Sequence, residues 1–214
     1  MTLSPAPRDV PSLLAALVAS DPGRPRLTWY GADGERVELS ARVLDNWVAK
    51  TANLLVEELD AGPGTRVRLD LPPHWRTAVW LLAVWAVGAD VVDEPAVDVV
   101  VATDAATDAG DARLVLVALP ALARGVPHLP NGALDYNAEV SGFGDVLLAD
   151  EPAVLPAVGP APARARVLVT SSAWSTPAWL APLLADGSVV LVDERLDEQR
   201  VARITEDERA TTQL

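Results

Sequence analysis

The chain has 214 residues, half of them hydrophobic, which is enough for a domain with a substantial buried core and excludes a disordered polymer. Thirty acidic and 17 basic residues give a formal net charge of −13, and this negative field opposes binding to nucleic acid and to anionic membrane surfaces. The absence of cysteine excludes disulfides, thiolate nucleophiles and cysteine metal ligands.

The N-terminal segment has neither a basic start nor a long apolar core, so it does not predict a secretory signal, and we expect a cytoplasmic protein. The longest apolar run, residues 78–89, has 12 residues, whereas roughly 20 are needed to span a bilayer. This run therefore predicts a buried helix.

The chain opens with an amphipathic helix and a β-hairpin. Residues 9–20 place apolar side chains at helical spacing, which predicts the helix. Asp33 and Gly34 then separate two apolar runs, residues 27–30 and 36–39, in the pattern typical of a tight hairpin turn.

A longer helix is predicted directly after the hairpin, where Ser40 occupies the N-cap position. Its apolar stripe contains Leu44, Trp47, Val48, Thr51, Leu55 and Leu59. Its polar face carries Arg42, Asp45, Lys50, Asn53 and Glu57. The separation of the two faces indicates one buried side and one solvated side.

Strands and helices alternate through the rest of the chain. A strand at residues 66–71 precedes a proline turn and an apolar helix at residues 74–87. Short valine-rich runs follow at residues 91–92, 97–102, 114–119, 167–169 and 189–192. This alternation predicts an α/β fold in which a central, mostly parallel sheet is flanked by helices. The predicted core includes Trp47, Leu55, Val79, Leu82 and Val84.

Proline content marks the expected domain limits. We expect an α/β main domain at residues 1–149, a proline-rich linker or loop at 150–165, a strand–helix–strand unit completing the same domain at 166–205, and a polar tail at 206–214.

Three consecutive segments resemble the N-terminal region of the adenylate-forming (AMP-binding, acyl-CoA synthetase) family. LTWYGADGERVELS resembles the family's opening strand pair, and ARVLDNWVAKTANLLVEELDAGPGTRV its first long helix and following turn. RVRLDLPPHWRTAVWLLAVWAVGADVV is similar to the next strand–turn–helix–strand unit. The resemblance covers about residues 25–100 and, more loosely, 167–193, and it extends to short actinobacterial relatives of the family. It implies the fold of part of the N-terminal domain of acyl-CoA synthetases; the alternative is a generic α/β unit preceded by a hairpin.

The family's chemistry requires a loop that wraps the phosphates of ATP, reading approximately Ser/Thr-Gly-Thr-Thr-Gly-x-Pro-Lys after a strand. The best match here is TSSAWSTPA at residues 170–178, which keeps the hydroxyls and the proline. Serines replace both glycines, Trp174 replaces a threonine and Ala178 replaces the lysine. Glycine permits close backbone approach to a phosphate, and a tryptophan crowds it. The resemblance thus implies a degenerate cofactor-binding loop at Thr170, Ser171, Ser172, Ser175 and Thr176.

A second alignment is possible. In it, WLAPLLADGSVVLVD at residues 179–193 matches a later helix and strand of the family, and the phosphate loop is deleted, leaving residues 150–165 in its place. A third interpretation is an ordinary strand-to-helix turn with cap-forming hydroxyls. None of the three provides an intact phosphate loop.

No other constellation predicts a catalytic or metal site. His74 and His128 have no metal-ligand spacing, and the Gly-x-Ser-x-Gly pattern of serine hydrolases is missing. Lys50, the one lysine of the chain, lies on the polar face of a helix, where we expect it to be solvated. A solvated rim is expected at Asp90, Asp93, Glu94, Asp98, Asp104, Asp108 and Asp111. We therefore assign no catalytic residue, no metal and no cofactor.

The sequence favours a non-catalytic relative of AMP-forming acyl-activating enzymes, acting as a scaffold or binding a small molecule or a protein partner. The alternative is half of an acyl-adenylate-forming ligase whose missing residues another protein supplies. A third possibility is an interaction module that uses the scaffold only for its shape. Under the first reading, the protein neither hydrolyses ATP nor forms an acyl-adenylate.

Overall fold

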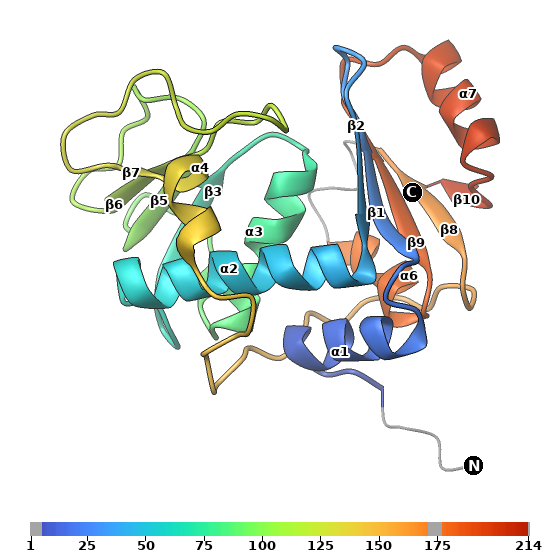
Figure 1. Cartoon of the computed structure of the whole chain (residues 1–214), viewed down its shortest axis with the longest axis horizontal. Coiled ribbons are helices and arrows are strands. Elements are labelled where there is room, and N and C mark those ends of the chain that lie inside the picture. The colour runs from blue at the N-terminus through green and yellow to red at the C-terminus, as the bar shows by residue number, and fades with distance from the viewer. Residues whose placement is uncertain (1–5, 171–176, 214) are drawn as a thin grey trace. The chain divides into compact units, whose positions relative to one another are not determined.

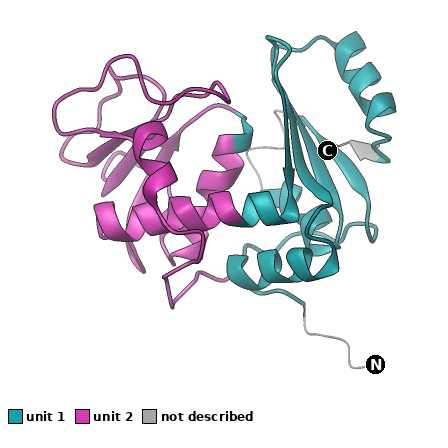
Figure 2. Cartoon of the chain, in the orientation of Figure 1, with its two compact units in different colours: residues 1–45, 73–75, 155–214 teal, residues 46–72, 76–154 magenta. Residues whose placement is uncertain are grey.

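The computed structural model describes residues 6–170 and 177–213, and these residues divide into two compact units. Unit 1 comprises residues 1–45, 73–75 and 155–214, and unit 2 comprises residues 46–72 and 76–154 (Figure 2). Each unit contains a five-stranded sheet. The α/β class with mostly parallel strands is as predicted, but there are two sheets instead of one central sheet. Local apolar patterns reveal which residues form strands and leave open which strands pair.

The sheet of unit 1 has the strand order β10-β8-β9-β1-β2 (Figure 1). Its strands are β1 (Pro25–Tyr30), β2 (Arg36–Ser40), β8 (Arg166–Val169), β9 (Ser188–Val192) and β10 (Thr212–Gln213). β1 and β2 are antiparallel, whereas β1–β9, β8–β9 and β8–β10 are parallel. β9 is buried at every position, as expected of a central parallel strand covered on both faces.

The β1–β2 hairpin turns where the sequence predicted. Gly34 has a φ of +90°, a left-handed conformation that glycine adopts without a steric penalty. The amide of Gly31 donates to the carbonyl of Glu35 at 2.9 Å and closes the hairpin. The Asp33–Gly34 prediction is confirmed.

The helices of unit 1 begin with α1 (Val10–Ser20), which a capping box starts. The Asp9 carboxylate accepts from the amide of Ser12 at 2.8 Å, and the Ser12 hydroxyl accepts from the amide of Asp9 at 3.3 Å. The other helical segments among the described residues of unit 1 are the 3-10 turn η2 (Pro177–Trp179), α6 (Leu180–Leu184), α7 (Glu198–Asp207) and the first residues of α2 (Ala41–Leu59). The expected polar tail after residue 205 thus contains the end of α7 and strand β10.

The sheet of unit 2 is entirely parallel, in the order β4-β3-β5-β6-β7. Its strands are β3 (Arg66–Asp70), β4 (Asp90–Val91), β5 (Val99–Ala102), β6 (Arg113–Leu116) and β7 (Leu134–Asp135). Its helical segments are the rest of α2, α3 (Trp75–Ala86) from residue 76, α4 (Tyr136–Glu139) and the 3-10 turn η1 (Val140–Gly142). After α3, Gly88 has a φ of +78°, and a Cβ there would lie 2.3 Å from the carbonyl oxygen of Glu151. This contact gives a physical reason for glycine at the step into β4.

Two segments of the chain bear on the expected domain limits. Residues 150–165 contain neither helix nor strand. Residues 166–205 belong to unit 1 with the N-terminal hairpin, because β9 pairs with β1. The expectation that both parts form a single main domain stays a prediction.

The predicted core is confirmed at four of five positions. Leu55, Val79, Leu82 and Val84 are fully buried, but Trp47 is only half-buried. The Trp47 ring faces the guanidinium of Arg76 with 5.4 Å between the Arg76 Cζ and the ring centroid, a cation–π contact that a stripe of apolar residues does not predict.

The polar face of α2 is only partly the solvated surface that the sequence suggested: Arg42 and Glu57 are exposed, but Asn53 and Lys50 are covered. Asn53 is fully buried: its amide donates to the carbonyls of Gly144 and Val146 at 3.0 and 2.8 Å and accepts from the amide of Leu148 at 3.0 Å. The Lys50 ammonium likewise donates to the carbonyl of Phe143. An extended segment covers this face of the helix, and side chain-to-backbone hydrogen bonds hold it there.

Truncation of the buried stripe tests the placement of the core. Leu55→Ala should lower the free energy of unfolding by about 2 to 5 kcal/mol, because it removes buried methyl groups and leaves a cavity. Leu122→Ala, at a side chain that is 94% exposed, is the matched control and should change stability by less than about 0.5 kcal/mol. Equal effects of both substitutions in urea denaturation would show that the core is misplaced.

Candidate functional site

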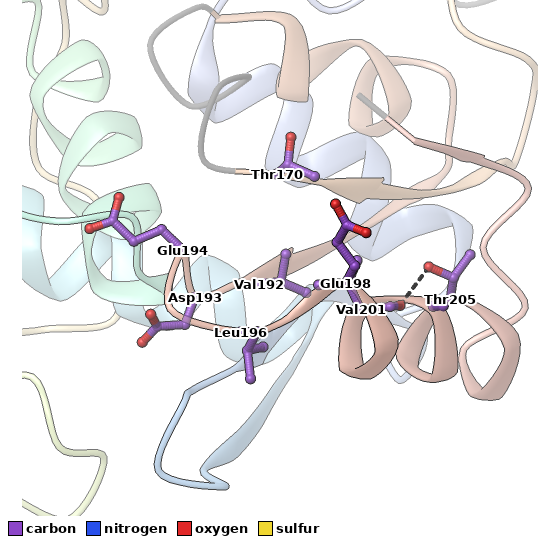
Figure 3. Close-up of a pocket in the computed structure, with 9 residues that line it drawn as sticks. Thr170, Val192, Asp193, Glu194, Leu196, Glu198, Val201 and Thr205 are labelled. Atoms are coloured by element: carbon purple, nitrogen blue, oxygen red, sulfur yellow. Dashed lines mark hydrogen bonds between the residues drawn. The ribbon is translucent and has the colours of Figure 1, made fainter.

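Unit 1 has a pocket of about 430 Å³ next to the carboxyl ends of β8 and β9 (Figure 3). It is lined by Thr170, Val192, Asp193, Glu194, Leu196, Glu198, Val201, Ala202 and Thr205. Thr170 follows β8, Asp193 and Glu194 follow β9, and the remaining C-terminal residues come from α7 or the turn before it. Ligands of parallel α/β sheets commonly bind outside the carboxyl ends of the strands, so the pocket lies where such a site is expected.

The pocket has an apolar base built by α7 packing on the sheet. Ile204 of α7 is buried against Leu168, Val190 and Val192, with Val201 packed beside them. The Thr205 hydroxyl donates to the carbonyl of Val201 at 2.8 Å and is thereby used within the helix. The base therefore offers apolar contact more than hydrogen bonding.

Asp193 is fixed in its ionised form at the end of β9. The Arg195 guanidinium donates to its two carboxylate oxygens at 2.9 and 2.6 Å, and the backbone amide of Arg195 adds a third hydrogen bond at 2.9 Å. These hydrogen bonds lower the pKa of Asp193 to about 2, despite the opposing effect of burial. Asp193 thus carries a negative charge at any physiological pH.

Two further carboxylates give the pocket a negative character. Glu194 and Glu198 are exposed, and the side chain of Glu198 points from α7 toward Thr170 (Figure 3). Three carboxylates against the one guanidinium of Arg195 leave 1 − 3 = −2 charges at the site. Such a field favours a neutral or cationic ligand and opposes phosphate.

Of the five residues expected to bind the cofactor, only Thr170 lies within the described part of the chain. Thr170 is half-buried at the end of β8 and lines the pocket. Ser171, Ser172, Ser175 and Thr176 lie outside the described residues. The assignment of this loop, and the choice between a degenerate and a deleted loop, stay predictions.

The two histidines have different environments. His74 is buried in unit 1, with its ring centroid 4.8 Å from that of Trp29 in an edge-on contact and its Nε2 3.8 Å from Glu35 Oε2. His128 is exposed in a loop of unit 2. All seven acidic residues expected to form a solvated rim are exposed, as predicted. Within residues 6–170 and 177–213, no group of three or more His, Asp or Glu side chains is placed to hold a metal ion.

A second polar cluster, which the sequence analysis did not predict, is centred on Glu208 just after α7. Its carboxylate accepts from Tyr30 on β1, Arg36 on β2 and Arg166 on β8. Arg166 also donates to the hydroxyl of Thr28 at 2.9 Å. Burial alone would raise the pKa of Glu208, but the hydrogen bonds from Tyr30, Arg166 and Arg36 lower it to about 2. The cluster joins the end of α7 to three strands of one sheet, which a local sequence pattern does not reveal.

Solved structures with the same architecture include acyl-CoA synthetases and an adenylation subdomain. The acyl-CoA synthetase of Brucella canis matches with a TM-score of 0.71 and 16% identity over 94% of this chain and 46% of that one. Acetoacetyl-CoA synthetase from Streptomyces lividans matches with a TM-score of 0.70 and 16% identity over 96% of this chain and 42% of that one. The N-terminal subdomain of NpsA from Klebsiella oxytoca matches with a TM-score of 0.69 and 12% identity over 96% of this chain and 61% of that one. The chain has the fold of the N-terminal subdomain of adenylate-forming enzymes.

Sequence comparison adds one relative. A "TIGR03089 family protein" of Mycobacterium tuberculosis is 39% identical over 150 residues, which cover 64% of this chain and 61% of that protein. No family model matches the sequence. The chain thus spans about six-tenths of this relative and less than half of the full-length synthetases. The predicted resemblance is confirmed at the level of the adenylate-forming fold.

No helix in the described part of the chain has both the length and the apolar character needed to cross a lipid bilayer.

The Glu208 cluster predicts a specific loss of stability in acid. The ordinary pKa of the Glu208 carboxyl is 4.5 and its pKa in the folded chain is about 2, so the ionised form stabilises the folded chain. That contribution, on the order of 2 to 3 kcal/mol, is complete above about pH 5 and is lost as the pH falls from 4.5 toward 2. Glu208→Gln should therefore lower the free energy of unfolding at pH 7 and make its pH dependence below pH 5 shallower. Glu206→Gln, at an exposed position of α7, is the control. Parallel pH profiles for wild type and Glu208→Gln would contradict this account.

Proposed function

We propose that the protein is a non-catalytic relative of AMP-forming acyl-activating enzymes, a cytoplasmic pseudoenzyme that uses their N-terminal scaffold to bind a small molecule or a protein partner. The observation that carries the proposal is the acidic pocket at the carboxyl ends of β8 and β9. A nucleotide bound at this edge of the sheet would bring its phosphates close to Asp193, Glu194 and Glu198.

The guanidinium beside the pocket and the one lysine of the chain both have other partners. The guanidinium of Arg195 is bound to Asp193, and the ammonium of Lys50 donates to backbone carbonyls within unit 2. Phosphate binding at a strand end relies on backbone N–H groups, hydroxyls and a cation, and residues 170–178 lack the glycines and the lysine that the family's loop uses. The ligand that fits best has an apolar body for the base of the pocket and a neutral or cationic head near Glu198.

The alternative function is one half of an acyl-adenylate-forming ligase whose remaining residues come from another protein. Thr170 favours it, because this residue follows β8, lines the pocket and directly precedes the segment that matches the family's loop. The N-terminal subdomain of NpsA is solved in complex with anthranilyl-AMSN, so a protein of this fold can hold a small molecule within that subdomain.

Thermal denaturation with a ligand panel separates the two functions. At least one ligand without net negative charge, from a panel that includes aliphatic and aromatic amines, should raise the melting temperature of the protein. Mg–ATP, AMP and CoA should leave that temperature unchanged. A ligand present at 100 times its Kd adds about 2.7 kcal/mol to the free energy of unfolding, an effect large enough to detect.

The pocket is then tested by substitution. Glu198→Gln should weaken an amine ligand by removing the carboxylate that faces Thr170, and Glu206→Gln on the same helix should leave its affinity unchanged. Stabilisation by Mg–ATP that Glu198→Gln strengthens would refute the pseudoenzyme and support the ligase half.

A further inference from the structure

A cluster of arginines lies at the opposite edge of the same sheet, before the amino ends of three adjacent parallel strands. Arg24 precedes β1, Arg164 precedes β8, and Asp186 precedes β9. Arg26 is the second residue of β1 and is fully buried. These residues all belong to unit 1.

The carboxylate of Asp186 is the centre of the cluster. Arg26 Nη2 donates to its Oδ1 at 2.7 Å, while Arg164 Nε and Arg24 Nη1 lie 3.4 and 4.0 Å from its Oδ2. Ser20 donates to the same Oδ2 at 3.0 Å. Three guanidinium groups therefore approach one carboxylate.

Both Nη atoms of Arg26 donate to groups within the fold, whereas Arg24 and Arg164 keep donors available. Arg26 donates to the carbonyls of Leu17, Asp186 and Gly187 as well as to the Asp186 carboxylate. Arg24 donates once from each Nη, to the carbonyls of Asp186 and Arg164. The side chain of Arg164 is 63% exposed, and neither of its Nη atoms bonds to a described residue.

The local charge differs in sign from that of the chain as a whole. The cluster contains three arginines and two carboxylates, those of Asp186 and of Asp21, which accepts from the amide of Arg24. Its net charge is therefore 3 − 2 = +1, whereas the net charge of the whole chain is −13. Burial, followed by repulsion from Arg26 and Arg164, lowers the pKa of Arg24. An anion placed between Arg24 and Arg164 would relieve this repulsion, and at physiological salt the distant acidic residues are screened beyond about 8 Å.

We propose that Arg24 and Arg164 form a binding site for an oxyanion, a phosphate or carboxylate group, at the amino edge of this sheet. The open N–H groups of a guanidinium match the oxygens of either group and can donate two parallel hydrogen bonds. The site is distinct from the acidic pocket, which lies at the carboxyl edge.

The test is a titration of the whole protein with inorganic phosphate, with acetate and with chloride at matched ionic strength, followed by NMR of the arginine Nε–H resonances. Saturable shifts of Arg24 and Arg164 with phosphate but not with chloride are expected. Shifts with phosphate alone would assign a phosphate group, and shifts with acetate as well would assign oxyanions in general. No saturable shift, or an equal response to chloride, would overturn the proposal.

Two substitutions with opposite expected effects sharpen the test. Arg164→Gln, at an exposed side chain, should lower the affinity for phosphate at least tenfold. Arg200→Gln, at an exposed position of α7, should leave that affinity unchanged. Asp186→Asn should raise the affinity for phosphate severalfold, because it removes the competing negative charge. Asparagine also tolerates the φ of +58° found at this position. An unchanged affinity in Arg164→Gln, or a weaker one in folded Asp186→Asn, would refute the site.

Discussion

The parallel pairing of β9 with β1 is the contact on which unit 1 depends. It places Leu27 beside Val189 and Tyr30 beside Val192, joining segments about 160 residues apart in the sequence. Through it, the N-terminal hairpin and the C-terminal strands become one sheet with β9 at its centre. Without this pairing, β8 and β10 would not be joined to β1 and β2 in one sheet, and the Glu208 cluster, which uses residues of β1, β2 and β8, could not form.

The same pairing gives the sheet two chemically different edges. Because β1, β8 and β9 are parallel, their carboxyl ends lie together at one edge and their amino ends at the other. Asp193, Glu194 and Glu198 gather near the first edge, and Arg24, Arg26 and Arg164 gather at the second. The negative charge at the carboxyl edge opposes the binding of phosphate groups near Thr170. The charge distribution therefore accords with the altered residues 170–178.

Local patterns predicted the elements well and their partners poorly. The turn at Asp33–Gly34, helix α1 and the buried positions of α3 follow from backbone preference and periodicity, which act over a few residues. Two sheets were not predicted, because each valine-rich run is compatible with several neighbours. Asn53 and Trp47 were misplaced for a related reason: a segment 90 residues away covers Asn53, and Arg76 faces Trp47. The position of the pocket, at the carboxyl ends of parallel strands, could be expected from the fold class. Its acidic lining could not, because Glu194 and Glu198 come from a turn and a helix whose sequences are typical of ordinary solvated surface.

Pyrophosphate–ATP isotope exchange, run with a broad panel of fatty, aromatic and amino acids, is the most direct measurement of whether this fold still supports adenylation. We expect no exchange above the protein-free blank for any acid, because residues 170–178 lack the glycines and the lysine of the family's loop and the pocket beside Thr170 is acidic. Robust exchange that disappears in the Ser171→Ala, Ser172→Ala double variant would contradict it and show that the chain carries a working phosphate loop.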